Sequence, residues 1–215
     1  MPVRRITNGG RKVIGKFPSI KNNRMVWWES QIERDYLYLI EMDPDVISYK
    51  EQPLKIRYSL DGKLHLYTPD FMVDRKNKRQ IVEVKDEETS KGEECKRLFE
   101  RIGPICRREG YEFAVVTERT IRVQPRLDNI KFIYKYAKAK MTSEYQIMLY
   151  SLFSVRESLS IEELIQGFAS RGVSSNIVYA LIHRGVLAVD LLEPIKPGSA
   201  AHLTTAFPKS RRKIA

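Results

Sequence analysis

The sequence predicts an α/β fold, with a mixed sheet flanked by helices and a small C-terminal domain. Two observations lead to this prediction. Over residues 30–117 a helical segment is followed by β-rich segments, a second helical segment and an apolar strand, an order typical of helices packed on a mixed sheet. After Pro125 the chain changes to helical segments that are rich in lysine and aromatic residues and lack an acidic cluster, which indicates a second, smaller unit.

The elements of the larger part follow from local patterns. Residues 30–43 carry apolar side chains at helical spacing and end before Pro44, so we expect an amphipathic helix. The dipeptide Asp61-Gly62 between two alternating segments is a strong hairpin signal. A charged loop is expected over 86–92, and then a helix to Glu109 that Gly103-Pro104 should break or kink. The expected extended segments are 46–52, 54–60, 63–67, 70–73, 80–85 and 111–117.

We expect a domain boundary near Lys140. Downstream, Ser160 and Glu163 have the spacing of a capping box. Two short helices, the second over 176–183, then precede two strand-like segments, and this is the sequence order of a winged helix. The polar side of the second helix could contact DNA, and its apolar side could equally fill a small core. The predicted divisions are a basic arm at 1–16, a main domain at 17–140, a winged-helix-like domain at 141–208 and a basic tail at 209–215.

The chain of 215 residues has a net charge of +11 and a pI near 9.6. Clustered cations at the N-terminus, at 75–79 and at 209–213 favour a polyanionic partner, since binding to phosphates releases counterions; the alternative is a charge that only keeps the surface soluble. No apolar run approaches the ~20 residues of a membrane span, and no signal peptide is recognisable, so we expect an intracellular protein. Cys95 and Cys106 lack zinc spacing and are expected to be free thiols.

The segment 81–85 carries the residues most suited to catalysis. Side chains two apart on a strand share a face, so Glu83 and Lys85 point the same way while Val84 points into a core. If the strand of Asp70 pairs with this one, two carboxylates and the Val84 carbonyl could hold Mg²⁺, with Mn²⁺ as a substitute, and Lys85 could orient a water. This is the outline of a phosphodiesterase site.

Each of these residues also has a purely structural explanation. Glu83 and Lys85 could form a surface ion pair, and Asp70 could be a turn residue after Pro69. Glu33 lies three residues after Ser30, as in a capping box, yet it also lies on the helix from which a third carboxylate could reach the metal. Polar and basic residues near the predicted strand ends could line a DNA groove or simply be solvated: Arg75, Lys76, Lys78, Arg119, Arg122, Gln124 and Arg126.

Several short blocks of the sequence resemble the TnsA-type transposon-end endonucleases. These blocks are Ser30-Gln31-Ile32-Glu33, Asp43-Pro44-Asp45-Val46, Glu51-Gln52-Pro53, Thr68-Pro69-Asp70-Phe71, Glu83-Val84-Lys85 and Tyr111-Glu112-Phe113-Ala114-Val115-Val116-Thr117-Glu118. The resemblance implies a restriction-endonuclease-like nuclease domain over 17–140. It also implies that Glu33, Asp70 and Lys85 are the catalytic trio and that Glu83 occupies the second metal-binding position.

The same resemblance implies a role in DNA transposition. It predicts a Mg²⁺-dependent endonuclease subunit that cuts the 5′ ends of a transposon, while a partner transposase of ribonuclease-H-like fold (TnsB-type) cuts and joins the 3′ ends. An ATP-dependent regulator (TnsC-type) would contact the C-terminal region. The endonuclease and its partners would act in the cytoplasm of a bacterial cell. The alternatives are a stand-alone restriction or junction-resolving nuclease, or an inactive winged-helix DNA-binding protein.

Overall fold

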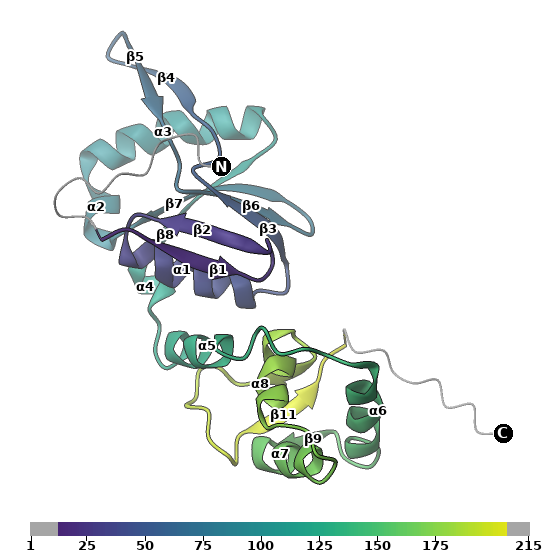
Figure 1. Ribbon diagram of the computed structural model, residues 1–215. Helices are drawn as coiled ribbons and strands as arrows, with labels where there is room; N and C mark the ends of the chain where they lie inside the picture. The colour runs from purple at the N-terminus through teal and green to yellow at the C-terminus, as the bar shows by residue number, and fades with distance from the viewer. Residues whose placement is uncertain (1–12, 206–215) are drawn as a thin grey trace. The chain divides into compact units, whose positions relative to one another are not determined.

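The computed structural model describes residues 13–205 (Figure 1). The basic tail at 209–215 and most of the basic arm at 1–16 lie outside the described residues. Contacts divide the chain into two compact units, Met1–Val123 and Gln124–Ala215. The division thus falls well before Lys140, because the segment after Pro125 packs with the second unit: Asn129 Nδ2 donates to the carbonyl oxygens of Leu191 and Glu193 at 2.9 and 2.8 Å.

A four-stranded mixed sheet forms the centre of the first unit, in the order β3-β6-β7-β8. Strands β6 and β7 pair antiparallel as a hairpin, and β7 pairs parallel with β8. Because β7 is central, Ile81, Val82 and Val84 are buried, and so is Glu83 between them. The strands are β3 (Val46–Glu51), β6 (Phe71–Arg75), β7 (Arg79–Lys85) and β8 (Glu112–Thr117). These strands confirm the predicted α/β class.

Two hairpins accompany this sheet. Strands β4 (Ile56–Leu60) and β5 (Lys63–Tyr67) form the predicted hairpin, and its two turn residues have positive φ angles, 51° at Asp61 and 73° at Gly62. Strands β1 (Gly15–Ser19) and β2 (Arg24–Trp28) form a second hairpin that the sequence analysis does not predict.

The helices confirm one prediction, correct a second and exclude the expected break at Gly103-Pro104. Helix α1 (Gln31–Met42) begins after the N-cap Ser30, as predicted, and buries Leu37 and Ile40. Residues Glu87–Lys91 form a short helix α2 where a loop is expected, because the Asp86 side chain accepts a hydrogen bond from the Thr89 amide and caps it. Helix α3 (Glu93–Arg108) continues through Pro104. Pro104 has no N–H to donate to the carbonyl four residues before it. Because Pro104 is exposed, that carbonyl can face water. Helix α4 (Glu118–Ile121) follows β8.

The second unit contains helices α5 (Arg126–Tyr134), α6 (Ser143–Leu152), α7 (Ile161–Ala169) and α8 (Asn176–His183) and a small sheet of order β10-β11-β9. The strands are β9 (Ser158–Ser160), β10 (Leu187–Val189) and β11 (Ala200–Leu203). The expected capping box is present at Ser160 and Glu163. Helices α7 and α8 followed by strands β10 and β11 agree with the predicted order, whereas strand β9 before α7 is not predicted. The winged-helix assignment itself stays a prediction. Among residues 13–205, no helix is long and apolar enough to cross a membrane.

Candidate active site

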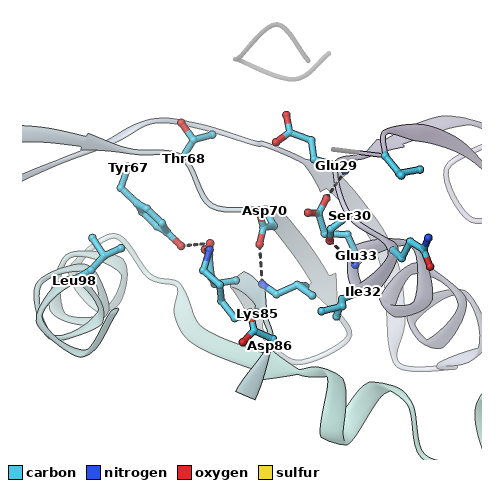
Figure 2. Close-up of a pocket in the computed structure, with 14 residues that line it drawn as sticks. Glu29, Ser30, Ile32, Glu33, Tyr67, Thr68, Asp70, Lys85, Asp86 and Leu98 are labelled. Atoms are coloured by element: carbon cyan, nitrogen blue, oxygen red, sulfur yellow. Dashed lines mark hydrogen bonds and ion pairs between the residues drawn. The ribbon is translucent and has the colours of Figure 1, made fainter. Parts of the chain in front are cut away.

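A cavity of about 600 Å³ opens in the first unit where the start of α1 meets the ends of β5 and β7 (Figure 2). Four residues predicted to carry the chemistry, Glu33, Asp70, Glu83 and Lys85, all line it, together with Val84. The other lining residues are Val13, Glu29, Ser30, Gln31, Ile32, Tyr67, Thr68, Asp86 and Leu98. The fold therefore brings together residues that lie up to 52 positions apart in the sequence.

Asp70 is fixed by the pairing of β6 with β7. Phe71 lies opposite Val82 in this pairing, so Asp70 sits just before β6 and reaches the far end of β7. Its Oδ2 accepts a hydrogen bond from the Val84 amide at 2.7 Å, and its carbonyl accepts one from the Gln52 amide at 2.8 Å. Asp70 is thus held by hydrogen bonds to both its side chain and its backbone.

Glu83 is the most buried of the acidic residues in the cavity, with 3% of its surface exposed. Its Oε1 lies 2.7 Å from the ammonium of Lys85, as expected for side chains two apart on one face. Its Oε2 accepts a hydrogen bond from the Tyr67 hydroxyl at 2.5 Å (Figure 2). Both oxygens of Glu83 therefore have partners that orient the carboxylate.

Tyr67 is a site residue that the sequence analysis does not identify. It is the last residue of β5 and is 8% exposed. Burial and the neighbouring Glu83 carboxylate raise the pKa of its hydroxyl, so the hydroxyl stays protonated and donates. The sequence signal for Tyr67 is weak. Its position three residues before Asp70 is the only hint, and its partner Glu83 lies sixteen residues later on another strand.

Glu33 both supports the start of α1 and faces the cavity. Its amide donates to Ser30 Oγ at 3.1 Å, and its Oε2 accepts from the Glu29 amide at 2.7 Å. The carboxylate thus accepts from the amide of Glu29, the residue before the N-cap, and not from the amide of Ser30, so the expected reciprocal capping box is incomplete. Burial raises the pKa of Glu33, and nearby Glu29 and Glu83 add to the effect.

The carboxylates in the cavity repel one another. Burial raises the pKa of Asp70 well above its usual range, and the charges of Glu83 and Glu33 raise it further. Burial alone would lower the pKa of Lys85, but Glu83 raises it, so the ammonium stays charged. Five carboxylates (Glu29, Glu33, Asp70, Glu83 and Asp86) and one ammonium (Lys85) line the cavity, which is therefore electronegative when ionised, and a cation would relieve the repulsion.

The donor set fits Mg²⁺ with few protein ligands. Within residues 13–205, no three His, Cys, Asp or Glu side chains are already arranged to hold a metal ion. Mg²⁺ keeps several waters, however, and is often bound through only one or two carboxylates. Asp70 and Glu83, with the Val84 carbonyl, supply such a set of oxygen donors, and Glu33 lines the same cavity. Cys95 and Cys106 are free thiols, as expected.

The predicted DNA-contacting residues are not gathered at the cavity. Arg75, Lys76 and Lys78 lie at the β6–β7 turn, about 15 Å along the hairpin from Asp70. All three form ion pairs, with Asp43, Asp45 and Glu112 respectively.

The remaining candidates differ in their surroundings. Arg119 is exposed on α4, just after the end of β8, which lies beside Lys85. Arg122 donates to the buried Asp35 at 2.8 Å and so helps to hold α4 against α1. Gln124 and Arg126 belong to the second unit. Of this set, Arg119 is the one positioned beside the end of β7.

The four-stranded mixed sheet and its flanking helices are consistent with a restriction-endonuclease-like fold. Residues 43–118 match the family model described as TnsA-like endonuclease N terminal. Residues 43–118 are therefore similar to the N-terminal domain of TnsA-like endonucleases, as the sequence motifs indicate. The match includes Asp70, Glu83 and Lys85 and begins after Glu33. No curated protein matches the chain.

Proposed function

We propose that this protein is a Mg²⁺-dependent DNA endonuclease that hydrolyses phosphodiester bonds at the 5′ ends of a transposon during cut-and-paste transposition. The observation that carries the proposal is the convergence of Glu33, Asp70, Glu83 and Lys85 on one cavity, with the last three inside the segment that matches the TnsA-like family model.

The side chains have distinct roles in this proposal. The metal is held by Asp70, Glu83 and the Val84 carbonyl. Glu33 adds negative charge beside it. Bound Mg²⁺ would neutralise charge on the phosphoryl group and make a water nucleophilic. The Val84 amide fixes the orientation of Asp70. Lys85, whose ammonium remains charged beside Glu83, orients the attacking water and stabilises charge that develops on the phosphate oxygens.

The proposal includes partner subunits. The family model names a TnsA-like endonuclease, and endonucleases of this kind work within Tn7-type systems that contain other subunits. We propose a TnsB-type transposase of ribonuclease-H-like fold as the subunit that processes the 3′ ends, and a TnsC-type ATP-dependent regulator as a partner of the second unit. Action in the bacterial cytoplasm is part of the same proposal.

The test is cleavage of transposon-end DNA by the full chain together with its transposase, with Mg²⁺ present. Wild type is expected to cut the 5′ strand. Asp70→Asn is expected to abolish that cut and Lys85→Ala to slow it strongly, and both should leave 3′ processing in place. The control is Lys91→Ala, which removes an exposed lysine that pairs with Glu87 on α2, outside the cavity. Undiminished 5′ cleavage by Asp70→Asn would refute the assignment. Cleavage of plain DNA by the chain alone would favour a stand-alone nuclease.

A further inference from the structure

The β4–β5 hairpin presents an unusual outer face. By its register, Arg57 lies opposite Leu66 and Ser59 opposite Leu64, so these four side chains share one face. Leu64 is 82% exposed and Leu66 is 63% exposed. Two neighbouring leucines on one ribbon face are more than the scattered exposure usual at a protein surface.

The opposite face of the hairpin is anchored to the domain. Ile56 and Tyr67 belong to a buried cluster with Ile102 and Cys106 of α3, and Tyr58 packs against this cluster. At the tip, the Asp61 carboxylate accepts hydrogen bonds from Arg97 Nη2 of α3 at 2.6 and 2.7 Å. The two-residue turn with positive φ angles at both positions matches the twist of the strands. The hairpin is therefore a preorganised ribbon, and Figure 1 shows it projecting away from the four-stranded sheet.

The charge around the exposed leucines is positive. Lys55, Arg57 and Lys63 are exposed, and none of them forms an ion pair with a carboxylate in the part of the chain that the structure describes. This distinguishes the hairpin from the β6–β7 turn, whose cations are paired. Cations without carboxylate partners can bind phosphates directly, because no ion pair within the protein has to be broken first.

The hairpin is also continuous with the candidate active site. Leu66 is followed by Tyr67 and Thr68, which line the cavity, and then by Asp70. A five-residue strand spans about 17 Å, or half a turn of duplex DNA. A phosphodiester bond held at the cavity would thus have its flanking duplex within reach of the ribbon.

We propose that the outer face of the β4–β5 hairpin binds the DNA duplex that flanks the scissile phosphodiester. Leu64 and Leu66 contact apolar base edges in a groove. Arg57 on the same face, and Lys55 two residues before it, contact the phosphates. A two-stranded ribbon fits the major groove, where thymine methyl groups offer apolar contacts. This inference rests on the proposed nuclease function and adds to it the surface that holds the substrate.

The test is binding of the full chain to a fluorescein-labelled duplex of about three helical turns, followed by fluorescence anisotropy without divalent metal at several salt concentrations. Leu64→Ser with Leu66→Ser is expected to weaken binding about tenfold and to leave the salt dependence unchanged. Arg57→Ala with Lys55→Ala is expected to reduce the magnitude of the negative slope of log K against log salt by about two. The matched control is Ile47→Ser, which removes a 60% exposed apolar side chain from β3 of the same unit.

Thermal melts and Mn²⁺ titrations of each variant separate the outcomes. The leucine variant is expected to melt like wild type, because its side chains are exposed, and to bind Mn²⁺ normally. DNA binding by the leucine variant equal to that of Ile47→Ser would overturn the hairpin proposal and leave the nuclease proposal intact. The hairpin proposal would also be overturned if the leucine variant bound DNA normally but lost the cleavage activity that is measured with the transposase. That result would favour a protein-binding face. Cleavage by Asp70→Asn would instead refute the nuclease proposal.

Discussion

Replacing Asp70 by Asn and by Ala separates its proposed metal-binding role from its structural role. The Asp70 carboxylate accepts the Val84 amide hydrogen bond at 2.7 Å, and burial and neighbouring carboxylates raise its pKa. Asn keeps an oxygen acceptor for the Val84 amide and removes the repelling charge. Ala removes the acceptor as well, so the two variants should differ in stability although neither binds the metal.

The magnitude follows from that hydrogen bond. A buried amide left without an acceptor costs about 1–3 kcal/mol, and 1 kcal/mol shifts Tm by roughly 2–4 °C for a chain of this size. Asp70→Ala is therefore expected to melt roughly 2–12 °C below wild type. Asp70→Asn is expected to melt at or above the wild-type temperature when no metal is present.

Metal changes the comparison. At a Mn²⁺ concentration of about 100 times Kd, binding stabilises the folded state by about 2.7 kcal/mol, which raises the wild-type Tm by roughly 5–11 °C. Neither variant should respond. Scanning fluorimetry with and without Mn²⁺ measures both effects. Equal metal-free Tm values for the Asn and Ala variants would refute the structural role, and a Mn²⁺-induced rise in the Tm of Asp70→Asn would refute the metal-binding role.

Three further predictions concern the same cavity. Tyr67→Phe removes the hydroxyl that orients Glu83 and should weaken Mn²⁺ binding about 10–100-fold in isothermal titration; unchanged affinity would show that Tyr67 only fills space. Lys85→Ala should slow 5′ cleavage at least about 100-fold while DNA binding persists, and a rate within a few fold of Lys91→Ala would contradict its role. Lowering the pH through the raised pKa of Asp70 should weaken Mn²⁺ binding at pH values above the usual carboxyl range, because the metal needs the ionised form. In metal-free melts the sign is opposite: the unfolded chain has already released the Asp70 proton that the folded chain retains, so the contribution of Asp70 to stability falls as pH rises through that window. Mn²⁺ affinity that is constant with pH would contradict this account.

The local parts of the fold could be predicted from the sequence. The Asp61-Gly62 turn and the alternation around Glu83 act over a few residues, and both gave the correct hairpin and strand. The β1–β2 hairpin has a weak sequence signal, because Pro18 within β1 argues against a strand. Helix α2 was missed because its charged sequence resembles a loop, although Asp86 and Thr89 have capping spacing.

The parts that depend on distant contacts could not be predicted. The boundary after Val123 reflects the bonds of Asn129 to residues 62 and 64 positions later. The pairing of Arg122 with Asp35 joins residues 87 positions apart and makes Arg122 a structural residue. The role of Tyr67 likewise depends on a distant contact, because its hydroxyl at the end of β5 donates to Glu83 on β7.

A crystal structure of the protein soaked in Mn²⁺, with an anomalous map to locate the ion, tests the central claim most directly. The account predicts a peak about 2.1 Å from carboxylate oxygens of both Asp70 and Glu83, with the Lys85 ammonium turned beside it. The same soak of Asp70→Asn should show no peak there. An ordered cavity without a peak in the wild type, or an ion bound away from Asp70 and Glu83, would contradict the account.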